Sequence, residues 1–153
     1  MVKILSHQEF LKTFINVPRV SVNLLIEDKQ GKLLLTQRAI TPGVGKWHYP
    51  GGFLLKGETI EACLKRLAKR EFNYDLKEAP EFVGVFENLA GDPRGHVIDL
   101  MYRLKLNHQI PLNATTETKA AQYFDRIPKE IGFNHHETRQ IHTGQFKSII
   151  VKL

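Results

Sequence analysis

The regular spacing of apolar residues is clearest in residues 59–72, which contain no Gly or Pro and predict an amphipathic helix. At about 100° per residue, Glu71 projects into the apolar face of this helix, one turn after Leu67. A carboxylate there needs a cation, a metal or hydrogen-bond donors, because burying it unpaired is costly. Asn73 suits the left-handed position that ends a helix. The apolar positions, at three-and-four spacing, are Ile60, Cys63, Leu64, Leu67 and Ala68.

A second amphipathic pattern, in residues 6–17, predicts a helix near the N-terminus. Ser6 and Glu9 have the spacing of a capping box, and Pro18 ends the segment. Its apolar face most simply packs on the rest of the chain, and a lid or a dimer element is the alternative. The apolar residues of this face are Phe10, Leu11, Phe14 and Ile15.

Shorter apolar runs between turn residues predict strands. Residues 28–31, Asp-Lys-Gln-Gly, have the composition of a tight turn and make a hairpin of the strands on either side. Residues 134–150 suggest a C-terminal helix capped by Asn134. The pattern therefore predicts one α/β domain, residues 1–153, on which the N-terminal segment 1–17 packs. The strands are expected at residues 20–27, 32–38, 82–86, 97–106 and 120–124.

Composition adds limits to this pattern. The hydrophobic content of 42% and charged content of 25% are ordinary for a soluble globular protein. The single cysteine, Cys63, excludes an intramolecular disulfide framework, and its place on the apolar stripe predicts a core residue. No signal-like or membrane-length apolar run is visible, so a cytoplasmic location is expected. The net charge of +6 favours anionic partners, but no nucleic-acid module signature accompanies it.

Residues 50–73 resemble the signature of the Nudix hydrolase family. The run GKWHYPGGF, which leads into this stretch, is also similar to the corresponding segment of many Nudix enzymes. Three positions depart from the signature, since Leu67 and Arg70 stand where it has Glu and Asn73 where it has Gly. The residues that fall in register are Gly52, Glu58, Arg66, Ala68 and Glu71.

The resemblance implies a Nudix-type α/β/α sandwich with a mixed β-sheet and a hydrolase that uses Mg²⁺ or Mn²⁺. Glu71 is then the main carboxylate ligand, and the Gly52 backbone carbonyl contributes to the same metal. Glu58 and Arg66 resemble the pair that braces the loop against the helix. Arg70 is expected either to neutralise Glu71 or to contact a substrate phosphate.

The substrate class implied by the resemblance is a nucleoside diphosphate linked to another moiety. The Arg-Leu pair and the single final Glu of the box are similar to those of GDP-mannose mannosyl hydrolases. Phe53 and the turn Asp92-Pro93-Arg94 instead resemble the ADP-ribose pyrophosphatase type. Arg38 and Arg94 are candidates for binding substrate phosphates, and Phe53 is a further substrate-binding candidate.

Glu117 is the candidate for a second acidic group, as general base or late metal ligand, with Asp92 as its competitor. The missing box carboxylates leave a second reading open, in which the domain binds a nucleotide or sugar nucleotide as a sensor without turnover. A third reading is an interaction domain with a vestigial cleft. The expected partner is a small nucleotide; neither a membrane nor a nucleic acid is expected, and a homodimer stays open.

Overall fold

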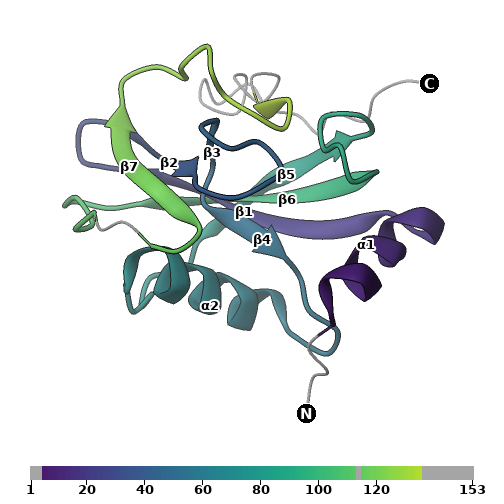
Figure 1. Cartoon of the computed structure of the whole chain (residues 1–153). Coiled ribbons are helices and arrows are strands. Elements are labelled where there is room, and N and C mark those ends of the chain that lie inside the picture. Colours follow the sequence, from purple (N-terminus) through teal and green to yellow (C-terminus); the bar gives the residue numbers. More distant parts are fainter. Residues whose placement is uncertain (1–4, 113–114, 136–153) are drawn as a thin grey trace.

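The computed structural model describes residues 5–112 and 115–135, which form one mixed seven-stranded sheet with two helices (Figure 1). This is the mixed α/β class that the sequence predicts. The expected C-terminal helix lies outside the described residues from residue 136 onward. Asn134, proposed as its cap, is described and has φ 56°, a left-handed conformation in place of the extended one typical of an N-cap. The elements in chain order are α1 (His7–Asn16), β1 (Arg19–Glu27), β2 (Leu33–Arg38), β3 (Trp47–His48), β4 (Gly51–Phe53), α2 (Ile60–Phe72), β5 (Glu81–Asn88), β6 (Val97–Lys105) and β7 (Thr118–Phe124).

The strand β1 lies at the centre of the sheet, whose order is β3-β2-β1-β6-β5. It pairs in parallel with β6 over its whole length and antiparallel with β2 and β4 on its other edge. The predicted hairpin between β1 and β2 is confirmed, and Gly31 closes its turn with φ 77°. Strand β7 pairs antiparallel with β2, and this pairing places the start of β7, at Thr118, beside Arg38. The short strands β3 and β4, within the aromatic and glycine segment, were not predicted.

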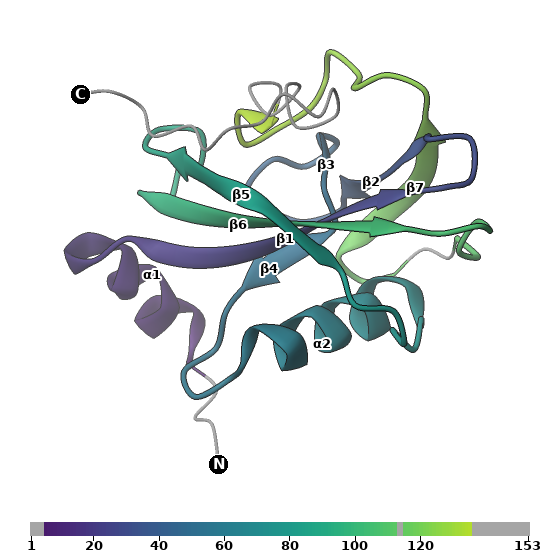
Figure 2. The same cartoon turned by 180° about the vertical axis from the view of Figure 1, so that it is seen from behind.

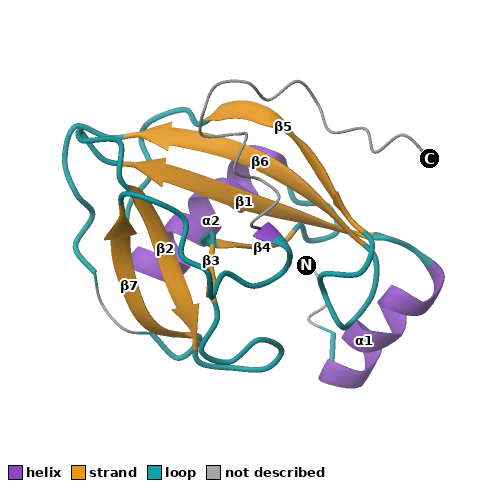
Figure 3. Cartoon of the chain, turned by 90° about the horizontal axis from the view of Figure 1, so that it is seen from above, coloured by secondary structure: helices purple, strands orange, loops and turns teal. Residues whose placement is uncertain are grey.

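Each face of the sheet carries its own apolar core. Helix α2 covers one face, where Val22, Leu24 and Ile26 of β1 pack against its apolar stripe (Figure 2). On the opposite face, Tyr49 and Ile131 cover residues of β1, β2 and β6. Figure 3 shows α2 behind the strands and α1 beside the start of β1. Alternate residues of one strand therefore belong to two different cores, as the period of two requires.

Helix α1 begins after Ser6, which forms the predicted capping box with Glu9. Its apolar face is narrower than the sequence suggested. Phe14 is buried against the domain, whereas Ile15 is 77% exposed and Leu11 38% exposed, so including Leu11 and Ile15 in the packing face was wrong. In the described part of the chain, no helix is long and apolar enough to cross a membrane.

Candidate active site

Helix α2 carries the acidic side chain of the predicted box into the protein. The hydroxyl of Thr59 accepts a hydrogen bond from the Ala62 N–H at 3.1 Å and caps the start of the helix. Asn73 ends it with φ 53°, the left-handed conformation expected there. Because the apolar stripe packs on the sheet, Glu71 on the same face is only 3% exposed. The helical stretch, its end at Asn73 and the inward direction of Glu71 follow the sequence prediction, whereas the Thr59 cap was not predicted.

An ion pair between Glu58 and Arg66 joins the loop before α2 to the helix itself. Arg66 donates to the two carboxylate oxygens at 2.6 and 2.8 Å and to the Phe53 carbonyl at 3.1 Å. Glu58 also accepts from the Leu55 N–H at 3.0 Å. The Arg66 hydrogen bonds lower the pKa of Glu58 to about 2. The pair therefore fixes the loop backbone at both ends, which a solvent-exposed salt bridge would not do.

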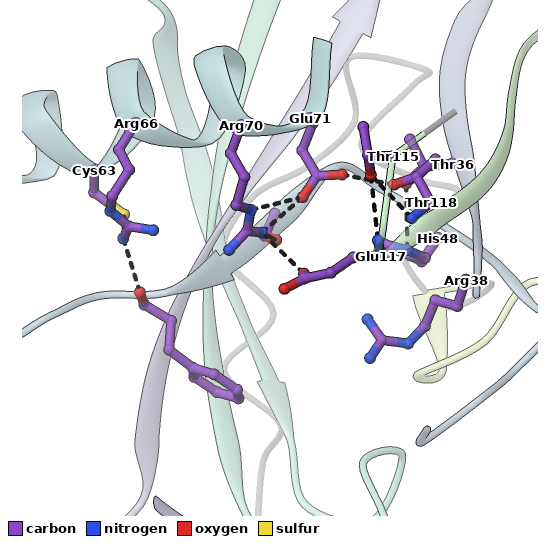
Figure 4. A network of polar contacts seen from close by, with 12 residues as sticks. Thr36, Arg38, His48, Cys63, Arg66, Arg70, Glu71, Thr115, Glu117 and Thr118 are labelled. Carbon is purple, nitrogen blue, oxygen red and sulfur yellow. Dashed lines mark hydrogen bonds and ion pairs between the residues drawn. The ribbon is translucent and has the colours of Figure 1, made fainter. Parts of the chain in front are cut away.

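Both carboxylate oxygens of Glu71 have hydrogen-bond partners (Figure 4). Oε1 accepts from the Arg70 guanidinium at 2.6 and 3.1 Å. Oε2 accepts from the Thr118 hydroxyl at 2.9 Å. The buried negative charge is thus balanced by a cation from the same helix and by a donor from β7, as a buried carboxylate requires.

The Arg70 Nη2 atom lies among oxygens from three parts of the chain. Its distances are 2.6 Å to Glu71 Oε1, 3.1 Å to the Gly51 carbonyl and 3.8 Å to Glu117 Oε2. Figure 4 shows the guanidinium between the two glutamates. The first alternative stated for Arg70, neutralisation of Glu71, is the arrangement seen in this structure. These oxygens, from α2, β4 and the loop before β7, mark one cationic position.

The carbonyl at this position belongs to Gly51 and not to Gly52, the residue singled out by the sequence. In the antiparallel β1–β4 ladder, the Pro50 carbonyl accepts from the Leu24 N–H at 2.8 Å. Carbonyls alternate in direction along a strand, so that of Gly52 also turns toward β1 and that of Gly51 turns away. Gly52 serves a different need, since a Cβ there would lie 3.2 Å from Arg70 Nη2.

Three guanidinium groups, those of Arg38, Arg70 and Arg94, line one cleft with a volume of about 280 Å³. Arg38 is held by a 2.6 Å hydrogen bond from its Nε to the Pro42 carbonyl. Burial, and then the positive charge of Arg94, lower the pKa of Arg38. Glu117 lines the same cleft. Like charges gathered in a partly buried cleft favour an anionic ligand.

An aromatic wall adjoins these charges. Phe53 packs on Phe10 and Phe14 of α1, with ring centroids 5.5 and 5.4 Å apart. The Arg94 guanidinium lies over the Phe53 ring, 5.1 Å from its centroid. Asp92 fixes that guanidinium with contacts of 2.9 and 2.6 Å. Helix α1 therefore supports the wall of the cleft, because its Phe10 and Phe14 side chains pack on Phe53.

A family model for the NUDIX domain matches residues 17–140. The chain belongs to the Nudix family. It is 35% identical over 122 residues to the ADP-ribose pyrophosphatase of Methanocaldococcus jannaschii, covering 78% of this chain and 70% of that protein. It is 34% identical over 98 residues to the low-salt glycan biosynthesis protein Agl8 of Haloferax volcanii, covering 64% of this chain and 62% of that protein. The NUDIX domain of Shewanella oneidensis NrtR, solved with ADP-ribose, has the same fold, with a TM-score of 0.72, 19% identity and coverage of 94% of this chain and 100% of that one.

The resemblance read from the sequence is thus confirmed, and residues 52–73 are the Nudix box of a Nudix hydrolase. The structure gives a physical account of two of its departures. Leu67 is fully buried in the core between α2 and the sheet, where a carboxylate could not stay hydrated. Arg70 places a side-chain cation against the remaining box carboxylate, Glu71.

Two residues of this Nudix site were missed or left undecided by sequence reasoning. Thr118 holds Glu71, but the strand predicted from the sequence began only at residue 120, and the pairing of Thr118 with Arg38 of β2 became visible only in the structure. His48 lines the cleft but is buried, with Nε2 3.2 Å from the Thr36 hydroxyl and Nδ1 2.7 Å from the Tyr49 carbonyl. Burial, and then the charge of Arg38, lower the pKa of His48 to about 4. His48 is therefore neutral at pH 7 and positions its neighbours.

Proposed function

We propose that this Nudix hydrolase cleaves a nucleoside diphosphate linked to a second moiety, with ADP-ribose as the first candidate, and uses Mg²⁺ or Mn²⁺. The observation that carries the proposal is the meeting of two kinds of groups in one cleft. Oxygens of Glu71, Gly51 and Glu117 surround one cationic position. Arg38 and Arg94 lie in the same cleft. Oxygens of this kind suit a divalent cation, and guanidiniums suit the oxygens of a diphosphate.

The donor set fits a divalent metal in chemistry, with one condition. Mg²⁺ prefers carboxylate and carbonyl oxygens and fills its remaining positions with water and substrate phosphate. Among residues 5–112 and 115–135, no three His, Cys, Asp or Glu side chains form a metal cluster, so Glu71, the Gly51 carbonyl and Glu117 are the protein donors proposed. Arg70 holds the cationic position in this structure and has to leave it for a metal. Its side chain is 39% exposed, which leaves it a path toward solvent or substrate. When bound, the metal neutralises phosphate charge and polarises the bond to be cleaved.

The arginines and the aromatic wall support a diphosphate-linked substrate. Arg38 has its Nε bound to the Pro42 carbonyl and lines the cleft, and a guanidinium there suits phosphate oxygens. Arg94 is braced by Asp92 and stacked on Phe53, so it presents its charge from a fixed place. The relative from Methanocaldococcus jannaschii is an ADP-ribose pyrophosphatase, which favours ADP-ribose. The relationship to Agl8, a glycan biosynthesis protein, keeps nucleotide sugars such as GDP-mannose in the test panel.

Glu117 is the proposed general base or additional metal ligand. Its backbone is anchored, since its carbonyl accepts from the Ala39 N–H at 2.9 Å and its N–H donates to the Thr115 hydroxyl at 3.3 Å. Its carboxylate is 45% exposed and faces the cleft, where it can take a proton from water. Asp92, the competitor, is committed to Arg94 through both carboxylate oxygens. This difference favours Glu117.

The test is hydrolysis of ADP-ribose, GDP-mannose and a nucleoside triphosphate with Mg²⁺, with Mn²⁺ and with excess EDTA. We expect ADP-ribose to yield AMP and ribose 5-phosphate in a reaction that EDTA stops and that the Glu71→Gln variant does not perform. Release of GDP and mannose from GDP-mannose would instead indicate cleavage at the sugar carbon. Absence of turnover on every substrate with either metal would overturn the proposal.

One observation favours a second candidate function. The Arg70–Glu71 ion pair satisfies the box carboxylate without a metal, which suits a domain that binds a nucleotide and does not cleave it. Tight calorimetric binding of ADP-ribose together with no turnover would support this sensor function. A cytoplasmic location and a homodimer stay predictions, which localisation and sedimentation of the full chain would test.

A further inference from the structure

A buried polar cluster lies on the floor of the cleft, away from the Nudix box carboxylate. Its members are Ser21 and Asn23 on β1 and Asp99 on β6, and all three line the cavity. The parallel register of these strands sets Ser21 directly beside Asp99. Asp99 is only 4% exposed. Three polar side chains side by side in the centre of a sheet need a reason, because apolar residues would pack there at no cost in desolvation.

The hydrogen bonds of Asp99 are divided unequally between its two oxygens. Oδ1 accepts from the Ser21 hydroxyl and from Asn23 Nδ2, the latter at 2.8 Å. Oδ2 is buried and has no hydrogen-bond partner within the described residues. A buried acceptor left without a donor destabilises the folded state, and it does so more strongly if it is charged. The cluster thus holds one oxygen firmly and leaves the other available.

Neighbouring groups do not remove this deficit. The Arg94 guanidinium is engaged by both oxygens of Asp92. Burial raises the pKa of Asp99 above its ordinary value, and the nearby side-chain amide of Asn88 lowers that pKa only in part. The hydrogen bond of this amide goes to the Phe133 carbonyl, at 2.8 Å, and Asp99 Oδ2 keeps no hydrogen-bond partner within the described residues. Asp99 Oδ2 can therefore accept a hydrogen bond from a group outside the cluster.

We propose that Asp99 is a specificity-determining residue whose Oδ2 accepts a hydrogen bond from a neutral N–H or O–H group of the substrate. This group belongs to the part beyond the diphosphate, either an amino group of the base or a hydroxyl of a sugar. The inference rests on the proposed function, since it assumes a nucleoside-diphosphate ligand in this cleft.

The placement of charge supports this division of the ligand. A carboxylate on the floor repels phosphate, whereas Arg38, Arg70 and Arg94 attract it, so the diphosphate and the neutral moiety take different parts of the cleft. Asn23 pairs with Gly51 across β1 and β4, which makes the polar floor continuous with the cationic position. A site built around a buried acceptor rejects ligands that lack the matching donor, because the acceptor then stays unpaired.

Asp99→Asn tests the inference with almost no change in shape. The amide oxygen still accepts from Ser21 and Asn23, and the amide nitrogen turns the free acceptor into a donor. We expect calorimetry in EDTA, where turnover plays no part, to show ADP-ribose binding weakened about tenfold or more. Pyrophosphate should bind equally well or more tightly, because a negative charge has been removed. Lys69→Ala, on the exposed side of α2, serves as the matched single-residue control.

Two further ligands separate the sources of the donor. ADP lacks the terminal ribose, and an ADP-ribose analogue with unsubstituted purine lacks the amino group of the base. If the effect of Asp99→Asn disappears with ADP, the donor is a hydroxyl of the terminal ribose. If it disappears with the purine analogue, the donor is the amino group. An effect that persists with both but not with pyrophosphate assigns the ribose of the nucleoside.

Equal binding of ADP-ribose by the variant and the wild type would overturn the inference, as would an equal loss for pyrophosphate. If the wild type binds none of these nucleotides, the proposed function fails first and the inference falls with it. If Asp99→Asn does not fold, as judged by thermal unfolding, Ser21→Ala takes its place. It removes one of the two donors that hold Oδ1, and a smaller loss with the same ligand pattern is expected; no loss would count against the inference.

Discussion

Arg70→Ala should tighten the binding of a divalent cation at the box carboxylate. The wild-type guanidinium makes contacts of 2.6 and 3.1 Å with Glu71 Oε1 and of 3.1 Å with the Gly51 carbonyl. A metal that uses these oxygens has to displace it. In the variant the oxygens are free of this competitor, while Thr118 still holds the other Glu71 oxygen.

The expected gain in metal affinity depends on how exposed the Arg70–Glu71 ion pair is to solvent. Hydrogen bonds to charged groups contribute about 1.5–3 kcal/mol when buried, and exposed ion pairs about 0–1 kcal/mol. Glu71 is buried but the Arg70 side chain is 39% exposed, so the contact is worth about 1.5 kcal/mol. Since about 1.4 kcal/mol is a factor of ten in Kd, we expect the variant to bind Mn²⁺ about tenfold more tightly.

The assay is titration of Mn²⁺ followed by the loss of its free electron-paramagnetic-resonance signal, with Mg²⁺ competition. Lys69→Ala is the matched control, because it removes the same charge from the adjacent residue, whose ammonium contacts Asp75 and not the cleft. A second readout is thermal unfolding. Without metal, Arg70→Ala leaves Glu71 short of a cation and should lower the Tm, and Mn²⁺ should restore it. An Mn²⁺ affinity no tighter than that of Lys69→Ala would refute the competition argued from the structure.

Three other predictions concern the same cleft and its brace. Glu117→Gln should lower turnover about 10²–10⁴-fold in steady-state kinetics with the fold intact; a full-rate variant moves the role to another acid. Arg38→Ala or Arg94→Ala should raise the KM for ADP-ribose, and unchanged KM values in both would contradict phosphate binding by either residue. Because Arg66 holds the pKa of Glu58 at about 2, below its ordinary 4.5, the pair should stabilise the fold fully above pH 4.5 and lose about 1–2 kcal/mol as pH falls toward 2. Thermal unfolding against pH should show this loss in the wild type and not in Glu58→Gln.

The elements that depend on nearby residues could be predicted from the sequence. The spacing of apolar residues predicted α2, and residues 59–72 and Asn73 marked its limits. The same periodicity predicted that Glu71 points inward. The Glu58–Arg66 brace was expected from the resemblance to the Nudix signature, and its partners lie on one helix and the loop that leads into it. Local hydrogen bonding and helical period determine these features, so the chain alone contains them.

Contacts between distant segments were decided only by the tertiary structure. The direction of the Gly51 carbonyl depends on the pairing of β4 with β1, and Thr118 reaches Glu71 only because β7 returns to β2. The sequence left two roles open for Arg70, and the convergence of oxygens from three segments favoured one of them. Asp99 was not singled out within the strand predicted at residues 97–106, because its burial and its free oxygen arise from parallel pairing with a strand about 80 residues earlier in the chain. The periodicity of apolar residues determines which face of a helix or strand a side chain lies on. The side chains that it contacts there are determined by how the strands pair.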